Sequence, residues 1–223
     1  MKTKTLLIAA ATLAVGVIGS QAQVYSANIV GYVNVPLSPG YNLIANPLND
    51  GNGNNISNIL ASANLANKSQ ILTWNGANYN GAIGKINADN HSWGSYISLN
   101  QGTGFFLKNA GTLTTNTFTG SVEPTGYASG ILVSNLLNPG YNLVGSVMPL
   151  GGELTTDATL NLSSATLANK TQLLGWNAGS QAYNGAVGKI TGGWGATFPV
   201  TVGQGFFLKS ANTSSTNWVQ TVQ

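Results

Sequence analysis

The stretch Gly102-Thr-Gly-Phe-Phe-Leu-Lys108 recurs with a single change as Gly203-Gln-Gly-Phe-Phe-Leu-Lys209. Alternate side chains of a β-strand point to opposite faces, so Phe105 and Leu107 share one face and Phe106 lies on the other face with the lysine. We expect Phe105 and Leu107 to lie in the hydrophobic core. The second phenylalanine of each copy then packs either beneath a helix or at an interface between repeated units.

Further segments recur at an offset that varies only between 100 and 104 residues, and the variation falls in Gly/Asn-rich turns. The recurring pairs are Pro39–Leu43 with Pro139–Leu143, Leu65–Leu72 with Leu167–Leu174, Trp74-Asn75 with Trp176-Asn177, Tyr79–Ile86 with Tyr183–Ile190, and Trp93-Gly94 with Trp194-Gly195. Such self-similarity indicates duplicated structural units. The sequence predicts two tandem homologous units, residues 23–122 and 123–223, with a boundary near residues 122–126.

Each unit has the pattern of short antiparallel strands. The β-branched run Ile29–Leu37 is closed by the turn sequence Ser38-Pro-Gly40, and Asn-Gly and Gly-Gly pairs elsewhere favour tight hairpins. The exceptions are Asn55–Ala63 and its counterpart Asp157–Ala165, in which the apolar spacing is helical and Asp157 is a candidate N-cap. The predicted fold is all-β, with two antiparallel β-sandwich or barrel-like units that each contain one short helix.

The N-terminus has the features of a secretory signal peptide. Lys2 and Lys4 precede the apolar stretch Leu6–Ile18, and Ser20-Gln-Ala22 places small residues where signal peptidase requires them. The 13 residues of this apolar stretch are too few to span a bilayer. We therefore expect residues 1–22 to be cleaved, no transmembrane segment in the mature chain, and a secreted protein that is periplasmic or extracellular.

The composition excludes several classes of function. The chain of 223 residues has eight lysines, no arginine, five acidic residues and no cysteine, so 6% of its residues are charged against roughly 25% in ordinary soluble proteins. Absence of cysteine excludes disulfides, thiolate metal sites and cysteine nucleophiles. Loss of Lys2 and Lys4 with the leader lowers the formal net charge from +3 to +1, and the other lysines form no basic patch. We expect no nucleic-acid partner.

All six lysines of the mature chain occur at repeated positions, whereas none of the acidic residues does. The pairs are Lys68 with Lys170, Lys85 with Lys189, and Lys108 with Lys209. One interpretation is architectural, because a lysine at a strand end covers apolar surface with its stem and discourages edge pairing. The other is a cationic site for an acidic polymer. The scatter of the lysines along the sequence favours the architectural interpretation.

The repeated tryptophans fall into two classes. Trp74 and Trp176 share a strand face with leucine and are expected to pack in the core. Trp93 and Trp194 follow Gly/Asn-rich or Gly-rich turns and are expected to be more exposed, where an indole can stack on a sugar ring. The candidate ligand or interface residues are therefore Trp93, Trp194, Phe106, Phe207, Lys108 and Lys209.

No catalytic or cofactor-binding pattern is found. The acids of the mature chain lie in turns or at the unit boundary and do not recur between the units, and the single histidine, His91, lies in a loop that the second unit lacks. Gly84-Lys85 lacks the first glycine and the following Ser/Thr of a phosphate loop. The segment Asp50–Asn55 resembles a calcium loop but has Ala61 at the position of the bidentate glutamate, so at most a weak calcium site is expected. We expect no cofactor and no enzymatic activity.

The sequence resembles uncharacterised secreted tandem-repeat β proteins of environmental Gram-negative bacteria. The resemblance rests on Val24-Tyr-Ser-Ala-Asn-Ile-Val-Gly-Tyr-Val33, Gly40-Tyr-Asn-Leu-Ile-Ala-Asn-Pro-Leu48, Trp74-Asn-Gly76 and Gly102–Lys108, and covers essentially the whole mature chain. It implies an exported β module and brings no catalytic residues with it.

Two functions are consistent with these features. The leading hypothesis is a secreted, non-enzymatic structural or cell-surface-associated protein that associates with itself, because duplicated β units of low charge lack the repulsion that keeps proteins apart. The alternative is a carbohydrate-binding module that uses Trp93 and Trp194 to hold an extracellular polysaccharide. A hydrolase with an unrecognised pair of acids ranks below both.

Overall fold

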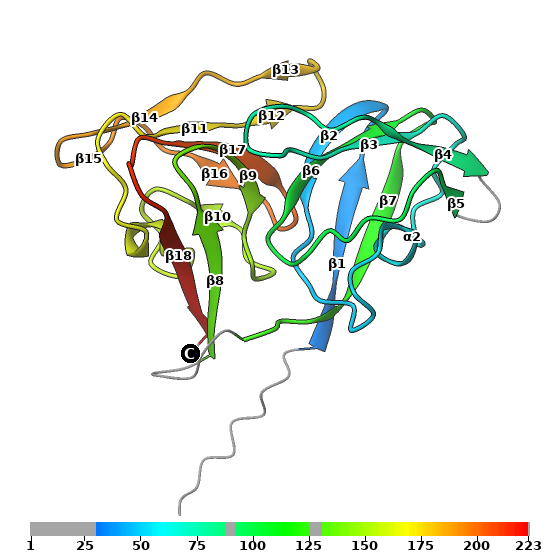
Figure 1. Ribbon diagram of the computed structural model, residues 1–223, viewed down its shortest axis with the longest axis horizontal. Coiled ribbons are helices and arrows are strands. Elements are labelled where there is room, and N and C mark those ends of the chain that lie inside the picture. Colours follow the sequence, from blue (N-terminus) through cyan, green and yellow to red (C-terminus); the bar gives the residue numbers. More distant parts are fainter. Residues whose placement is uncertain (1–29, 88–91, 125–130, 223) are drawn as a thin grey trace, which may run out of the picture.

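The protein is all-β, and its strands are joined in antiparallel sheets (Figure 1). The computed structural model describes residues 30–87, 92–124 and 131–222. The elements of the first half are β1 (Val30–Leu37), β2 (Gly40–Ala45), α2 (Ile56–Ile59), β3 (Gln70–Leu72), β4 (Ile83–Asn87), β5 (Ser92–Trp93), β6 (Gly104–Asn109) and β7 (Thr114–Ser121). In the part described, no helix is long and apolar enough to cross a membrane.

The second half follows a similar order with additional short strands. Its elements are β8 (Ile131–Leu137), β9 (Gly140–Gly145), β10 (Gly152–Glu153), the 3₁₀ helix η1 (Leu162–Ser164), β11 (Gln172–Leu174), β12 (Trp176–Asn177), β13 (Ala182–Tyr183), β14 (Val187–Ile190), β15 (Gly193–Trp194), β16 (Pro199–Val200), β17 (Gly205–Ser210) and β18 (Thr216–Val222). The predicted signal peptide, residues 1–22, and His91 lie outside the described residues.

Two five-stranded sheets dominate the fold, and both are open. The first sheet has the strand order β2-β6-β3-β4-β5, and the second has the corresponding order β9-β17-β11-β14-β15. Each is accompanied by a two-stranded ribbon, β1–β7 in the first half and β8–β18 in the second. Figure 1 shows the two sheets side by side, with both ribbons running toward the same end of the molecule. The strands β2 and β9 are the inner edges of the two sheets.

The turn before each inner edge strand follows from its Pro-Gly-Tyr-Asn sequence. Gly40 and Gly140 have φ values of 88° and 84°, which glycine adopts without a Cβ penalty. The side chain of Asn42 closes the turn, since its Oδ1 accepts from the N–H of Ser38 at 2.9 Å and its Nδ2 donates to the Ser38 carbonyl at 2.8 Å. Asn142 makes the same pair of bonds to Asn138. The repeated motif therefore sets where β2 and β9 begin.

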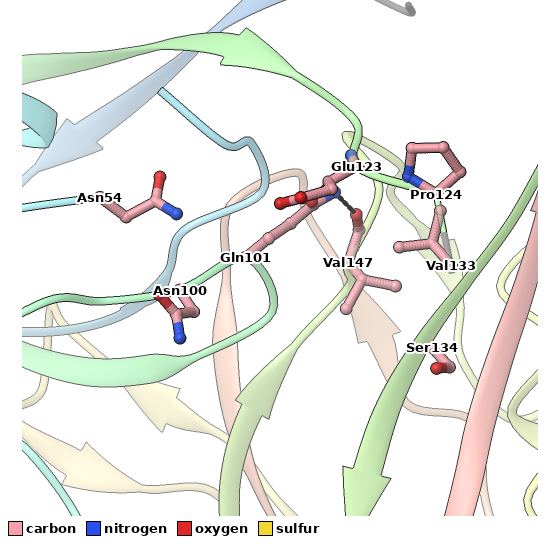
Figure 2. A pocket seen from close by; sticks show the side chains of 8 residues that line it. All are labelled: Asn54, Asn100, Gln101, Glu123, Pro124, Val133, Ser134 and Val147. Carbon is pink, nitrogen blue, oxygen red and sulfur yellow. Dashed lines mark hydrogen bonds between the residues drawn. The ribbon is translucent and has the colours of Figure 1, made fainter. Parts of the chain in front are cut away.

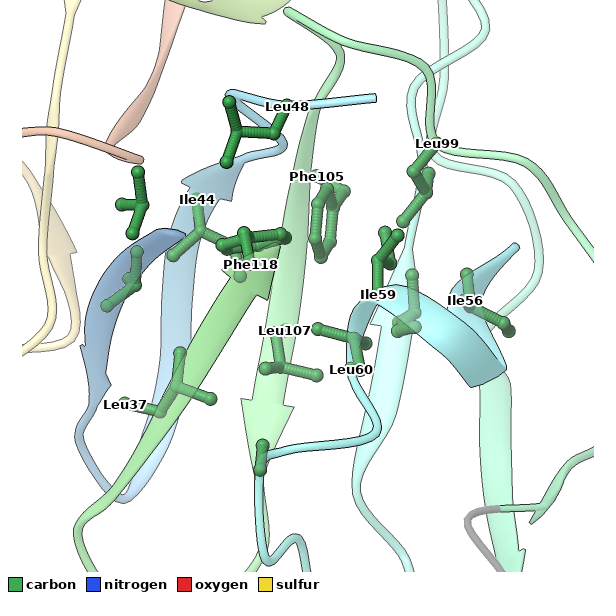
Figure 3. Packing of buried hydrophobic residues seen from close by; sticks show 14 of the residues in the cluster. Leu37, Ile44, Leu48, Ile56, Ile59, Leu60, Leu99, Phe105, Leu107 and Phe118 are labelled. Atoms are coloured by element: carbon green, nitrogen blue, oxygen red, sulfur yellow. The ribbon is translucent and has the colours of Figure 1, made fainter. Parts of the chain in front are cut away.

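The main core lies between the first sheet and the β1–β7 ribbon (Figure 3). Side chains of β1 alternate, with Val33 and Val35 buried and Tyr32 exposed, as expected for a strand with one face on the core. Phe105 and Leu107 are fully buried in this core, and Phe206 and Leu208 are fully buried in the corresponding core of the second half. The predicted division of the Gly-x-Gly-Phe-Phe-Leu-Lys strand into a core face and an outer face is confirmed.

The two predicted helices have different outcomes. In the first half a short helix is present, and Asn55 caps it by accepting from the N–H of Ser57 at 2.9 Å. The prediction of a second α-helix over residues 157–165 is wrong, because only the 3₁₀ turn η1 forms there. Asp157 instead bonds to Thr159, and Asn161 at φ 48° lies in the left-handed region that interrupts a helix.

Candidate functional site

The inner edges of the two sheets meet through reciprocal backbone hydrogen bonds. The N–H of Ala45 donates to the carbonyl of Gly203 at 2.8 Å, and the N–H of Gly145 donates to the carbonyl of Gly102 at 3.0 Å. Single β-bridges beside them pair Ile44 with Gln204 and Val144 with Thr103. Each half therefore offers its edge strand to the glycine-containing turn of the other half, with approximate two-fold symmetry.

The glycines of the repeated motif are required by this contact. Gly102 and Gly203 have φ values of 79° and 75°, and a Cβ at either position would collide with a valine, Val147 or Val35 respectively. A Cβ on Gly104 would lie 2.8 Å from the backbone nitrogen of Val144 in the other half. Sequence reasoning missed this role, although the presence of the same two glycines before both Phe-Phe pairs was a usable signal of close backbone approach.

Aromatic side chains cover the outer faces of the two sheets where they meet. We call this cluster the aromatic seam; its rings belong to Tyr41, Trp74, Tyr79, Phe106, Tyr141, Trp176, Tyr183 and Phe207. Phe106 and Phe207 are 5% exposed, so these two candidate residues lie at the contact between the halves. The sequence left two arrangements open for these phenylalanines, packing beneath a helix or at an interface between the units, and the structure places them at the interface.

The tryptophans Trp74 and Trp176 tie each half to the edge strand of the other. The indole Nε1–H of Trp74 donates to the carbonyl of Tyr141 at 3.0 Å, and that of Trp176 donates to the carbonyl of Tyr41 at 2.8 Å. Each ring meets a phenylalanine of the opposite half edge to face, with a centroid separation of 5.3 Å for Trp74 and 5.1 Å for Trp176. Both indoles are half-buried rather than enclosed in a core, which corrects the expectation from the sequence.

Two tyrosines meet at the centre of the seam. The hydroxyl groups of Tyr79 and Tyr183 are 2.7 Å apart, and either can be the donor. Each of the two rings lies within 6.3 Å of both Phe106 and Phe207. Burial raises the pKa of Tyr79 above its ordinary value, and the hydrogen bond to Tyr183 and the charge on Tyr183 raise it further. Tyr79 therefore stays protonated at any physiological pH, within hydrogen-bond distance of the Tyr183 hydroxyl.

Four of the repeated lysines lie over aromatic rings. Lys108 and Lys209 lie over Tyr41 and Tyr141, with Nζ 5.7 and 5.1 Å from the ring centroids. Lys85 and Lys189 lie over Trp93 and Trp194, each at 5.7 Å. The remaining pair, Lys68 and Lys170, shares a left-handed backbone conformation. Each repeated pair of lysines thus keeps the same aromatic contact or the same backbone geometry in both halves, and the ring contacts favour the architectural interpretation.

The expected exposure of Trp93 is wrong. Its side chain is 7% exposed and belongs to the first core, because it pairs with Lys85 across β4 and β5 and turns inward. Trp194 is half-buried against the second core, with Lys189 over its ring. These positions leave Trp93 without a free face on which a sugar could stack.

A hollow of about 350 Å³ is lined by residues of both halves (Figure 2). Glu123 is the single acid among the residues that line it, and its carboxylate accepts from the side chain of Asn49. Gln101 spans the hollow, because its Oε1 accepts from the N–H of Glu123 and its Nε2 donates to the carbonyl of Val147. Among the described residues that line the hollow, no second acid or base accompanies Glu123.

The other described acids each accept hydrogen bonds through at least one carboxylate oxygen. Desolvation raises the pKa of Glu153, but bonds from the Thr155 hydroxyl and from the N–H groups of Phe198 and Thr155 outweigh it and lower the pKa overall. Bonds from the Thr159 hydroxyl and N–H lower the pKa of Asp157. In the segment that resembles a calcium loop, Oδ1 of Asp50 accepts from backbone N–H groups within the loop. Within the described ranges, no three His, Cys, Asp or Glu side chains cluster as metal ligands would.

Two adjoining depressions open on one side of the seam. One, of about 230 Å³, is lined by Trp74, Tyr79, Tyr141, Leu174, Tyr183 and Phe207 and is almost wholly apolar. The other, of about 330 Å³, runs along β9, and its lining includes Asn75, Asn135 and Asn138. We call the second one the β9 groove. An uncharged groove with aromatic rings at one end suits a neutral polar ligand.

Comparison of the chain with protein-family models, with curated protein sequences and with solved structures finds no match.

Proposed function

We propose that the protein is a secreted, non-enzymatic structural or cell-surface-associated protein that associates with itself. In this proposal two tandem homologous β units, residues 23–122 and 123–223, follow a signal peptide that is cleaved after Ala22. The observation that carries the proposal is the pair of exposed isoleucines, Ile86 and Ile190, at equivalent outer sheet edges of the two repeated units. The repeated glycines and aromatic residues already join the two halves of one chain, so association between chains uses these outer edges.

Exposed apolar residues at the outer sheet edges supply a surface for association between chains. Ile86 in β4 and Ile190 in β14 occupy equivalent positions and are 67% and 57% exposed. Each lies in the strand that pairs with a two-residue edge strand, β5 or β15. Apolar side chains next to a sheet edge favour contact with another chain, and the low net charge gives little opposing repulsion.

Sedimentation velocity of the mature protein over a wide concentration range tests self-association. We expect the weight-average sedimentation coefficient to rise with concentration, and the doubly substituted variant Ile86→Lys/Ile190→Lys to shift this rise to higher concentration. The matched control is Tyr32→Lys/Leu113→Lys, which adds the same charge at residues that are 71% and 66% exposed away from these edges. A monomer at every concentration that also fails to bind the producing cells contradicts the proposal.

The carbohydrate-binding alternative receives no support at the two tryptophans on which it was based, because Trp93 is buried and the ring of Trp194 is covered by Lys189.

A further inference from the structure

The hydrogen bonding of the inner edge strands differs between the two halves at one pair of equivalent tyrosines, Tyr41 in β2 and Tyr141 in β9. In β2, the N–H of Tyr41 donates to Oε1 of Gln181 at 2.7 Å, and Nε2 of Gln181 donates to the carbonyl of Tyr41 at 3.0 Å. A single carboxamide from the second half thus satisfies both outward-facing backbone groups of one edge residue. The same carbonyl also accepts from the indole of Trp176.

The glutamine is present because one loop is longer than its counterpart. Six residues, 177–182, separate Trp176 from Tyr183, whereas four residues, 75–78, separate the equivalent Trp74 from Tyr79. Gln181 has a φ of 53°, and its Nε2 also donates to the carbonyl of Ala178 at 2.6 Å, so the loop holds the carboxamide in place. The shorter loop of the first half supplies no such side chain to the second half.

The equivalent position in β9 is open. N–H groups alternate in direction along a strand, so those of Tyr141 and Gly145 point to the same side of β9. The N–H of Gly145 points away from the neighbouring strand β17 and donates to the carbonyl of Gly102, so the N–H of Tyr141 also points away from β17. Among the described residues that N–H has no acceptor, and the Tyr141 carbonyl accepts from Trp74 alone. A Cβ on Gly40 would meet Gln181 at 2.6 Å, whereas a Cβ on Gly140 would have nothing within 4 Å.

We propose that the edge of β9 at Tyr141 binds a primary carboxamide, presented as the side chain of a glutamine in another polypeptide. The chain's own Gln181 demonstrates the binding mode at the equivalent site. A primary amide carries an N–H on the same side as its carbonyl oxygen, so it can donate to and accept from one backbone residue at once. A trans secondary amide carries its N–H on the opposite side and makes only one of the two bonds.

The β9 groove accommodates a polypeptide ligand. Its volume of about 330 Å³ exceeds that of a carboxamide, which leaves room for the neighbouring main chain. Its lining is uncharged. Asn135 uses its Nδ2 to bond Gly102 and Asn138 uses its Oδ1 to bond Ser215, which among the described residues leaves Oδ1 of Asn135 and Nδ2 of Asn138 for a peptide backbone. A glutamate is rejected at the same place, because a carboxylate cannot donate to the Tyr141 carbonyl. This proposal stands independently of the self-association proposed above.

The binding is tested on the ¹⁵N-labelled mature protein by following backbone amide and indole signals during titration. The probe is N-acetyl-glutamine N′-methylamide, and the matched probes are its glutamate counterpart, its side-chain N-methylated form and N-acetylglucosamine. We expect the glutamine probe to shift the amide signal of Tyr141 and the indole signal of Trp74, and to leave the amide of Tyr41 unmoved. Each matched probe is expected to bind at least about fivefold more weakly, as the loss of one hydrogen bond predicts.

The variant Gln181→Ala supplies an internal control. Gln181 is exposed and outside both cores, so we expect the fold to persist and the Tyr41 amide to respond to the glutamine probe as Tyr141 does. An unmoved Tyr141 amide in the wild-type protein overturns the proposal. An equal response to the glutamate or N-methylated probe also overturns it, and an equal response to N-acetylglucosamine replaces it with a sugar site.

Discussion

Gly102 and Gly203 show how a single missing side chain permits the contact between the halves. Both adopt a backbone conformation that L-residues avoid, and both face a valine, so conformation and space impose the same requirement. The lysines over Trp93 and Trp194 likewise recur in the two halves, because Lys85 and Lys189 each place Nζ 5.7 Å from the centroid of an indole ring.

Replacing Gly102 by alanine is expected to destabilise the protein by about 1–3 kcal/mol, because the added methyl group collides with Val147 and strains the left-handed backbone. Urea unfolding measures the change. Gly84→Ala is the matched control, since its Cβ meets nothing within 4 Å, and we expect it to leave the stability unchanged or slightly higher. Equal effects of the two substitutions would falsify the steric explanation.

The lowered pKa of Glu153 predicts how the stability of the folded protein depends on pH. The pKa of Glu153 is lower in the folded than in the unfolded protein, so its contribution to stability is complete above its unfolded pKa of about 4.3 and is lost as the pH falls through the folded pKa. The urea midpoint is therefore expected to fall as the pH is lowered from about 5, and Glu153→Gln is expected to reduce that fall. A variant with the same acid sensitivity as the wild type would assign the effect to other groups.

At the scale of elements, the strands were largely predictable and their mutual placement was not. Alternation along Gly104–Lys108 identified the core face, and the Pro-Gly-Tyr-Asn turns marked where β2 and β9 begin. Periodicity failed for residues 157–165, because local side-chain bonds at Asp157 and the left-handed Asn161 compete with helix formation. The exposure predicted for Trp93 from the Asn-containing turn before it also failed, because a turn does not determine which way the next ring points.

The inner edge strands predict an unequal response to loss of the two indole bonds. Trp74→Phe leaves the Tyr141 carbonyl without its protein donor, whereas Trp176→Phe leaves the Tyr41 carbonyl still bonded to Gln181. We expect Trp74→Phe to cost about 1 kcal/mol and Trp176→Phe to cost less. Parallel urea titrations of the two variants measure the difference, and a larger loss for Trp176→Phe would contradict this account of the edges.

At the scale of the whole molecule, the seam joins two cores that the sequence presents as separate. Val147 of the second half is buried in the first core beside Gly102, and Val202 packs against the same core. The repeat pattern indicates that two similar units exist, but a pattern within one unit does not say which face meets the other. The pairing of β2 with the turn before β17 was for that reason beyond prediction from the sequence.

This shared packing predicts that the two halves unfold together. We expect intrinsic tryptophan fluorescence and far-ultraviolet circular dichroism to report a single coincident transition in urea, and the calorimetric and van't Hoff enthalpies to agree. Gly102→Ala is expected to shift this transition without splitting it. Two resolved transitions in the wild-type protein would indicate halves that are stable independently of the seam.

The reciprocal seam also limits how many modules can be strung together. In an isologous contact both partners use the same surface patch, so one partner occupies the patch completely and leaves no room for a second. A chain with a third module of this kind would leave the aromatic face of that module exposed to solvent. Only a second chain with an odd number of modules could cover that face. Growth beyond a pair therefore has to proceed through the outer flanks of the molecule, and module number in such chains is expected to be even.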